Sequence, residues 1–360
     1  GTIGADLWQT VIHFEVDGFL PDWTTKVRGN VSAGLIAVDD VVIAASTSGD
    51  VFATTGSTKR ARRGWSTRIG AIHNHPVLDD AQGRLILPSA DHHLYALDVD
   101  TGKKVWSSDL GAPVMSDLSL HTVDDERVVL AIAVDTLFCV GAEDGKIIWQ
   151  RQLEGISRGR ANCDGEQVYL GVGDGCNWAF DARTGEPVWN VLQAGGHEGT
   201  YRLLTHGPWQ AQRLLLPDDR ILTGSRASLL CLSRTTGEQL WQRDGGFAYT
   251  FAPRMWGDQV LAIEDTGIVL LLDPATGEAS LEVPSVVPYM KNADCLVRDS
   301  TVFVTGAGGL VGAIDLDTGT ARRVGQISTD YVFSSPVLSS DGSRYVVATM
   351  GGELRSYSLD

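Results

Sequence analysis

Short stretches of alternating hydrophobic and polar residues recur along the chain, and polar turns that contain glycine join them in pairs. Residues 94–106, LYALDVDTGKKVW, show the pattern clearly. A predicted strand ends at Asp98, a turn is closed by Thr101 and Gly102, and a second strand leads to Trp106. Strand residues that flank a glycine-containing turn are typical of a β-hairpin. The pattern therefore predicts a hairpin in this stretch.

The same hairpin pattern is repeated along most of the chain. It recurs at residues 138–149, 179–189, 231–241, 271–281 and 313–323, and a degenerate copy ends at Trp65. Successive turn glycines of the six clear copies are 43, 40, 52, 40 and 42 residues apart; they are Gly102, Gly145, Gly185, Gly237, Gly277 and Gly319. A period near 40 residues with about four short strands per repeat is typical of propeller blades, not of helical solenoids. The copies therefore predict seven blades.

An eighth blade can be assembled from the two ends of the chain. Residues 330–360 supply three predicted strands and end where a turn and a fourth strand should follow. Residues 19–29 contain Trp23 and the trailing Gly29, the pair that follows the hairpins elsewhere. A ring closed by strands from both termini leaves no exposed edge. We therefore predict an all-β, eight-bladed β-propeller with four-stranded blades, a single domain over residues 1–360 in which residues 19–29 complete the blade formed by residues 330–360.

On these hairpins, with their AxDxxTGxxxW pattern, the chain resembles the quinoprotein-like (PQQ-like repeat) propeller family over nearly its whole length. The resemblance implies an eight-bladed propeller but no single activity. The family includes PQQ-dependent alcohol dehydrogenases, the lipoprotein scaffold of outer-membrane protein assembly, and sensor domains of bacterial Ser/Thr kinases. Its dehydrogenases pair adjacent cysteines beside the quinone and hold calcium with carboxylate and amide ligands. No Cys-Cys dipeptide occurs in this sequence, so we expect no PQQ cofactor.

The net charge limits the classes of partner that we expect, and the cysteine content indicates the cellular compartment. The formal net charge of −16 argues against nucleic acid, because proteins that bind its backbone usually present a basic surface. No run of about 18 apolar residues is present, so no membrane span is predicted. The five cysteines are an odd number without a repeated spacing, which predicts neither a disulfide framework nor a CxxC metal site. We therefore predict a cytoplasmic protein, unless the chain begins after a cleaved secretory signal.

Residues that break the repeat are the candidates for function, because the repeat itself accounts for the fold. In a propeller of this kind the innermost strand of each blade starts at the ring axis on one face. Blade eight has serines there, Ser334 and Ser335, which we take as the ordinary residues. Other blades have distinctive side chains at this position: His73, His75, Asp117, Arg158, Arg160, Phe251, Lys291 and Asn292. Because side chains alternate along a strand, His73 lies on the same side as His75, and Arg158 on the same side as Arg160. We expect this set to converge on a central funnel.

A predicted insertion lies on the same face of the ring. The interval of 52 residues between Gly185 and Gly237 is the longest of the series, and the extra residues fall within residues 196–209. Long loops on a rigid scaffold commonly carry function or act as lids. This loop contains an acid, two imidazoles, a phenol, a guanidinium and an indole, which belong to Glu198, His197, His206, Tyr201, Arg202 and Trp209.

The histidines suggest an alternative to a purely polar funnel. His73 and His75 present two imidazoles on one strand face, and His92 or His93 on a nearby loop would complete a set of metal ligands. The other reading is that the loop histidines are solvated polar residues. The sequence contains no EF-hand loop, HExxH motif or thiolate cluster, so our leading expectation is that no metal is bound.

The basic residues lead to the main functional prediction. Arg158, Arg160, Arg202 and Lys291, directed at one axis, would repel one another unless an anion or carboxylates such as Asp117 and Glu198 balanced them. The two readings are an internal network of salt bridges and a site for a small anionic or polar molecule. We favour the ligand site. Arg158, Arg160 and Lys291 would hold a carboxylate or phosphate, and Phe251 and Trp209 would supply apolar walls.

A catalytic role for the funnel and a scaffold role for the ring are both open. If the funnel is catalytic, His75 or Tyr201 would act as general base or acid, and Arg202 would stabilise developing negative charge. Those groups fit an elimination, cyclisation or hydrolysis without PQQ, that is, a lyase, cyclase or hydrolase. The alternative is a non-catalytic propeller that docks proteins, like the assembly scaffold of the family, or a sensor propeller. A broad apolar patch on the rim would favour docking.

Overall fold

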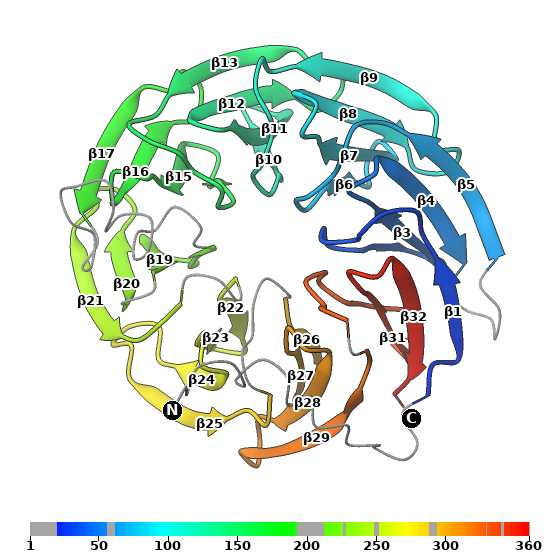
Figure 1. Ribbon diagram of the computed structural model, residues 1–360. Coiled ribbons are helices and arrows are strands. Elements are labelled where there is room, and N and C mark those ends of the chain that lie inside the picture. The colour runs from blue at the N-terminus through cyan, green and yellow to red at the C-terminus, as the bar shows by residue number, and fades with distance from the viewer. Residues whose placement is uncertain are drawn as a thin grey trace, which may run out of the picture.

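The protein is a closed ring of β-sheets around a central axis (Figure 1). The structure, a computed structural model, describes residues 20–55, 62–192, 212–225, 228–247, 252–287, 294–328, 330–339 and 342–359. In these ranges eight four-stranded antiparallel sheets are present and helices are absent, so none of the described segments is a helix long enough to cross a membrane. This confirms the predicted all-β fold, the eight blades and the four strands of each blade.

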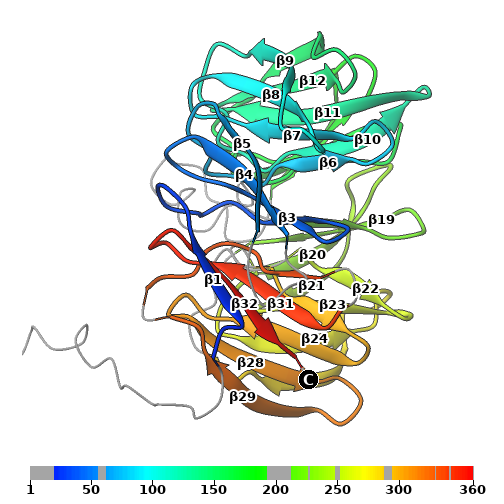
Figure 2. The same cartoon turned by 90° about the vertical axis from the view of Figure 1, so that its right-hand side faces the viewer.

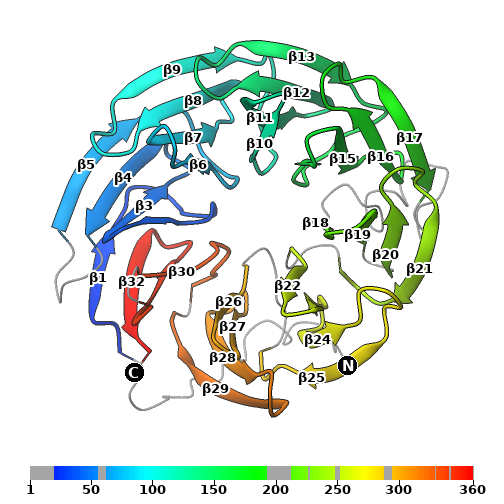
Figure 3. The same ribbon diagram turned by 180° about the vertical axis from the view of Figure 1, so that it is seen from behind.

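Each blade runs from an innermost strand at the axis to an outermost strand at the rim, as both faces of the ring show (Figures 1 and 3). The innermost strands are β2 (Ile36–Val38), β6 (Val77–Asp79), β10 (Ser119–Val123), β14 (Asn162–Cys163), β18 (Arg213–Leu215), β22 (Arg254–Trp256), β26 (Leu296–Arg298) and β30 (Val337–Leu338). The second strands are β3 (Val41–Ala45), β7 (Arg84–Pro88), β11 (Glu126–Ala133), β15 (Gln167–Gly171), β19 (Arg220–Gly224), β23 (Gln259–Ile263), β27 (Thr301–Thr305) and β31 (Arg344–Ala348). The third strands are β4 (Asp50–Thr55), β8 (His93–Asp98), β12 (Thr136–Gly141), β16 (Cys176–Asp181), β20 (Ser228–Ser233), β24 (Ile268–Leu272), β28 (Leu310–Asp315) and β32 (Glu353–Ser358). The outermost strands are β5 (Arg62–Arg68), β9 (Lys104–Asp109), β13 (Ile147–Gln152), β17 (Pro187–Leu192), β21 (Gln239–Asp244), β25 (Ala279–Pro284), β29 (Thr320–Gln326) and β1 (Trp23–Lys26).

The hydrophobic core is divided into layers between neighbouring blades. Eight buried clusters occur among the described residues, one at each junction between two blades. The second strands are therefore covered on both faces. In β3, β7, β15 and β23 four buried residues follow a half-buried first one, so these strands are continuous apolar runs and not alternating ones. The outermost strand β9 instead buries only Trp106.

The repeated tryptophans join neighbouring blades, as their constant position predicted. The indole Nε1–H of Trp106 donates a hydrogen bond to the carbonyl oxygen of Ala142 in the next hairpin, at 3.1 Å, and Trp149 does the same to Ala182 at 2.8 Å. The Trp106 ring lies on the turn glycine of that hairpin. A Cβ atom on Gly145 would lie 2.6 Å from the ring, and the residue has φ +74°. Glycine is therefore required both by the left-handed turn and by the indole packed on it.

The ring is closed by strands from both ends of the chain. Strand β1 pairs antiparallel with β32, with Trp23 opposite Ser356 and Lys26 opposite Glu353. Figure 2 shows β1 beside β32, close to the C-terminus. Trp23 is buried in the cluster between the eighth and first blades. The predicted closure of the last blade by an N-terminal strand is observed.

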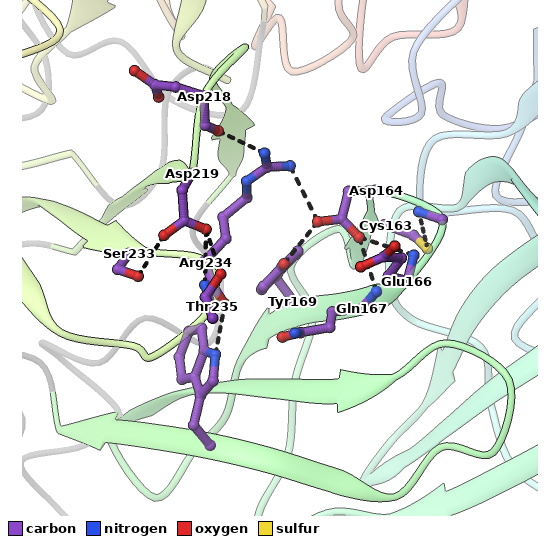
Figure 4. Close-up of polar contacts among 12 residues, drawn as sticks. Cys163, Asp164, Glu166, Gln167, Tyr169, Asp218, Asp219, Ser233, Arg234 and Thr235 are labelled. Atoms are coloured by element: carbon purple, nitrogen blue, oxygen red, sulfur yellow. Dashed lines mark hydrogen bonds and ion pairs between the residues drawn. The ribbon is translucent and has the colours of Figure 1, made fainter.

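A polar network links the fourth and fifth blades at the turns that lie away from the starts of their innermost strands (Figure 4). The guanidinium group of Arg234 donates to Asp164 Oδ2 at 3.1 Å and to the carbonyl oxygen of Asp218 at 2.6 Å. The hydroxyl group of Tyr169 donates to the same Asp164 oxygen at 2.8 Å. The carbonyl oxygen of Arg234 accepts the indole N–H of Trp189 at 2.8 Å. These contacts stabilise the scaffold. The candidate site lies at the opposite end of the axis, where the innermost strands start.

Candidate ligand site in the central funnel

A cavity of about 490 Å³ lies at the end of the axis where the innermost strands begin. Every blade contributes residues to its lining, and each contribution comes just before or at the start of an innermost strand. The polar members are Ser32, His73, Asn74, His75, Asp117, Arg158, Arg160, Gln212, Arg254, Asp294 and Ser335. The strand geometry explains this convergence, because eight innermost strands that start at one face bring their first residues to a common axis.

Five of the predicted site residues line this cavity: His73, His75, Asp117, Arg158 and Arg160. His92 and His93 are not in the lining; His93 forms local contacts, with Nδ1 at 2.9 Å from the carbonyl oxygen of Asp91. The remaining predicted residues lie outside the described part of the chain: His197, Glu198, Tyr201, Arg202, Trp209, Phe251, Lys291 and Asn292. Ligand binding by the five lining residues stays a prediction.

The alternative metal site is not formed by the histidines that the sequence suggested. In the described ranges, no three His, Cys, Asp or Glu side chains lie together in a way that could hold a metal ion. Both ring nitrogens of His75 instead make hydrogen bonds to protein side chains. His73, His75, His92 and His93 therefore do not form a common ligand set.

Asp117 is held as a carboxylate and fixes the orientation of His75. Its Oδ1 atom accepts hydrogen bonds from the backbone N–H of His75 and from His75 Nδ1, both at 2.9 Å, and Oδ2 accepts one from the Gln212 amide at 2.9 Å. Burial alone would raise the pKa of Asp117. The charge that His75 carries when protonated, its hydrogen bonds and the positive charge of Arg160 outweigh burial and hold this pKa well below its usual range.

His75 reaches across the first blade to the eighth. Its Nε2 atom lies 2.9 Å from Ser335 Oγ, which also accepts the backbone N–H of Asp294 at 3.0 Å. The imidazole passes over Gly34. A Cβ atom on Gly34 would lie 2.0 Å from His75 Cδ2 and 2.6 Å from Nε2. The missing side chain in the first blade therefore makes room for the contact between the second and eighth blades.

Positive charge is distributed around the same cavity. Arg254 forms an ion pair with Asp294, with 2.5 Å between Nη2 and Oδ1. The Nε–H group of Arg160 is buried, and none of the described residues accepts a hydrogen bond from it. A buried donor normally has a partner, because leaving it unpaired costs free energy. Arg160 is therefore the lining residue with unused capacity for an anion.

Four further residues line the cavity that the sequence pattern does not predict: Ser335, Gln212, Arg254 and Asp294. In the repeat pattern Ser335 is an ordinary residue. A signal was present in the sequence, since Ser335 precedes Pro336 as His75 precedes Pro76. Equivalent positions before an innermost strand face the same axis, so the two side chains could have been compared with each other.

Comparison with known proteins places this geometry in a family. The family described as outer membrane protein assembly factor BamB matches residues 2–121, 90–207 and 198–355. The outer membrane protein assembly factor BamB of Burkholderia pseudomallei (strain K96243) is 26% identical over an alignment of 304 positions, and the match covers 75% of this chain and 75% of that protein. The polyvinylalcohol dehydrogenase of Sphingopyxis sp. (strain 113P3) is 23% identical over 68% of this chain, and the match spans only 50% of the dehydrogenase.

Solved structures show the same fold. BamB from Moraxella catarrhalis superposes with a TM-score of 0.73 and 18% identity, covering 95% of this chain and all of that one. The quinohemoprotein alcohol dehydrogenase ADHIIG of Pseudomonas putida superposes with a TM-score of 0.68 and 15% identity, covering 95% of this chain and 76% of that one. At these identities the likeness concerns the fold alone.

The residues of the funnel do not fit a quinone and calcium centre of the kind that the family resemblance implies for its dehydrogenases. The sequence has no adjacent cysteines, and the described lining offers no group of three metal-ligating side chains. Asp117 is occupied by His75 and Gln212. We therefore derive no step through a quinone, and its absence stays a prediction.

The cytoplasmic location predicted from the cysteines was wrong. The matching family and the Burkholderia relative are named for the outer membrane, which points to a location outside the cytoplasm. Free cysteines are a weak guide to the compartment here, because four of the five are buried within the blades. All five are free, and burial raises the pKa values of the Cys139, Cys231 and Cys295 thiols to about 12.

The match to the family therefore covers most of the chain, and the eight-bladed ring agrees with it. The chain belongs to the PQQ-like repeat family described as outer membrane protein assembly factor BamB, and it is related to quinoprotein dehydrogenases.

Proposed function

We propose that the protein binds a small anionic molecule, or the anionic group of a larger one, in the axial cavity. The observation that carries this proposal is the buried Nε–H of Arg160, which lines the cavity and has no acceptor among the described residues. Charge-assisted hydrogen bonds from a guanidinium group to a carboxylate or phosphate are stronger than neutral ones. An anion that enters the cavity would accept hydrogen bonds from this guanidinium group.

The engagement of the nearby carboxylates supports an anion site over an internal network of salt bridges. Asp117 lies close enough to feel the charge of Arg160, yet His75 and Gln212 already donate to its oxygens. Asp294 is paired with Arg254. The two described carboxylates of the lining are therefore used by other partners.

The proposal is tested with succinate as the probe anion and succinamide as its neutral counterpart, by isothermal titration calorimetry. We expect succinate to bind and succinamide not to bind. Arg160→Gln should weaken succinate binding at least about tenfold, since a hydrogen bond to a charged group contributes about 1.5–3 kcal/mol. Arg322→Gln, an exposed change on β29, should leave binding unchanged. Equal binding of succinate by the Arg160 variant and the wild type would contradict the proposal.

A second candidate function is docking of a polypeptide on the rim. The outermost strands β9, β13, β17 and β21 follow one another around the rim (Figure 1). Each exposes an apolar residue directly before its tryptophan. Val105, Ile148, Val188 and Leu240 are 43%, 47%, 48% and 48% exposed. Exposed apolar residues that recur on neighbouring blades offer a long partner several apolar contacts along the rim. The name of the relatives, outer membrane protein assembly factor, agrees with a polypeptide as partner.

The docking candidate is tested with a dye-labelled, urea-unfolded outer-membrane protein diluted into a solution of the propeller, by fluorescence anisotropy. The double change Ile148→Ser and Val188→Ser should weaken binding about tenfold, because two apolar contacts of somewhat less than 1 kcal/mol each are lost. Thermal unfolding should hardly change, since both side chains are half exposed. The control is Val286→Ser, a similarly exposed residue away from these strands. Unaltered anisotropy in the double variant would remove the rim as the docking surface.

A further inference from the structure

Three side chains from three blades form a continuous chain of hydrogen bonds along the wall of the funnel. Ser335 Oγ lies 2.9 Å from His75 Nε2, and His75 Nδ1 lies 2.9 Å from Asp117 Oδ1. All three residues line the cavity of about 490 Å³. They come from the eighth, second and third blades, and Ser335 and His75 are 260 residues apart in the sequence.

The carboxylate of Asp117 determines the directions of the hydrogen bonds in this chain. Asp117 can only accept at Oδ1, so Nδ1 of His75 carries the hydrogen of that contact. In the neutral imidazole Nε2 is then an acceptor, and the hydroxyl hydrogen of Ser335 points at it. The backbone N–H of Asp294 occupies another side of Ser335 Oγ at 3.0 Å and holds the hydroxyl in place.

We propose that Ser335, His75 and Asp117 form a nucleophilic triad that hydrolyses carboxylic esters in the funnel. A hydroxyl nucleophile, an imidazole base at hydrogen-bond distance and a carboxylate that orients the base are the groups that this chemistry requires. The choice of esters that carry an anionic group rests on the proposed function, since Arg160 would hold that group.

The reaction needs only an ester and water. Ser335 Oγ attacks the ester carbonyl carbon while its proton passes to His75 Nε2. The tetrahedral adduct then collapses, the bond from carbon to the alcohol oxygen breaks, and Nε2 returns the proton to the departing alcohol. Water next attacks the acyl carbon and gives a proton to Nε2. The bond between carbon and Ser335 Oγ breaks, and the serine recovers this proton as the free acid leaves.

Gly34 positions the imidazole without touching a substrate. Any Cβ atom at this position would lie within 2.6 Å of two imidazole atoms, so Gly34→Ala must displace the ring. The backbone of Gly34 is not in the left-handed region, so alanine itself causes no strain in the main chain. Gly34→Ala therefore changes the position of the imidazole base and leaves its chemical nature unchanged.

The first test is labelling of the whole protein with a fluorophosphonate, followed by mass spectrometry of its peptides. We expect the phosphonyl group on Ser335. Ser335→Ala should abolish labelling, while Ser107→Ala, an exposed change on β9, should not affect it. His75→Gln and Gly34→Ala should each slow labelling at least about 100-fold.

Thermal unfolding of each variant accompanies the labelling. A folded Ser335→Ala variant that is labelled like the wild type overturns the triad, and so does a wild-type protein in which Ser335 stays unmodified. Gly34→Ala keeps both Ser335 and His75 and changes only the position of the imidazole. Rapid labelling of Ser335 in a folded Gly34→Ala variant would therefore show that His75 is not the base.

A second measurement separates the triad from the proposed anion site. Hydrolysis of 4-acetoxybenzoate, which carries a carboxylate, is compared with that of neutral phenyl acetate. We expect a preference for 4-acetoxybenzoate that Arg160→Gln removes, while hydrolysis of phenyl acetate persists and depends on Ser335. If succinate binds but Ser335 is neither labelled nor needed for hydrolysis, the triad fails and the anion site stands. If Ser335 reacts without preference for the anionic ester, the triad stands and the anion site fails.

Discussion

Gly34 decides whether the funnel contains a connected chain of side chains or separate ones. The first blade lies between the second and eighth blades, so a side chain at residue 34 would stand between His75 and Ser335. With glycine there, the imidazole of His75 reaches Ser335 in the eighth blade and Asp117 in the third, both at hydrogen-bond distance. Because the backbone conformation of Gly34 is ordinary, its role comes from the space it leaves and not from its flexibility.

His121 makes the stability of the ring depend on pH. It lies on β10, and burial lowers its pKa from 6.5 to about 4, although a hydrogen bond with the backbone of Ala161 favours the protonated form and the charge of Arg160 opposes it. The folded state therefore holds this imidazole neutral. Between pH 6.5 and 4 the unfolded chain binds more protons, so stability is complete above about pH 6.5 and falls as the pH drops.

We expect His121→Gln to remove part of that pH dependence. The free energy of unfolding of the wild type should fall by an additional amount on the order of 2–3 kcal/mol from pH 7 to pH 4.5, and the variant should lack this part. Urea unfolding at the two pH values measures the difference. His92→Asn, an exposed change that suits the positive φ of that residue, serves as control and should keep the wild-type dependence. An identical loss in wild type and His121→Gln would show that the imidazole is not held neutral by burial.

The strands and hairpins were predictable because their sequence signals are local. A turn that needs a positive φ selects glycine, and the tryptophan of the preceding blade packs on that glycine, so Gly145 and Trp106 keep their places in the repeat. The closing strand β1 was predictable for the same reason, since Trp23 has the offset of the other tryptophans. The residues that form such a signal lie within about ten positions of one another or one repeat period apart.

The candidate site was only partly predictable from the sequence, because its contacts cross from blade to blade. His75, Asp117 and Arg160 stood out as unusual residues at the starts of innermost strands, and they do line the cavity. Ser335 did not stand out, since serine is common before a strand. Its contact with His75 depends on a glycine in a third blade and on the exact closure of the ring. Neither condition can be seen in the periodicity of one blade.

The whole ring determines which blades meet, and the eighth blade pairs strands from opposite ends of the chain. In the other blades a loop connects the third strand to the outermost one. In the eighth blade strand pairing and packing hold β1 to β32, and the junction with the first blade follows β1. Strand β1 therefore carries both the edge pairing of β32 and the link from the eighth blade to the first. Because Ser335 lies in the eighth blade and His75 beyond the first, the same junction keeps the proposed triad together.

Removal of β1 should open this junction. A chain that begins at Asn30 loses Trp23, which is 5% exposed, and leaves the edge of β32 unpaired. Loss of a buried tryptophan costs about 3–5 kcal/mol, and an unpaired edge promotes association with other chains. We expect a thermal midpoint lower by at least about 5 °C and oligomers in size-exclusion chromatography with light scattering. A synthetic peptide of residues 20–28 should restore the midpoint and the monomer, whereas the same peptide with Trp23→Ser should not. A truncated chain that stays monomeric and as stable as the full one would show that the ring closes without β1, through contacts between the first and eighth blades alone.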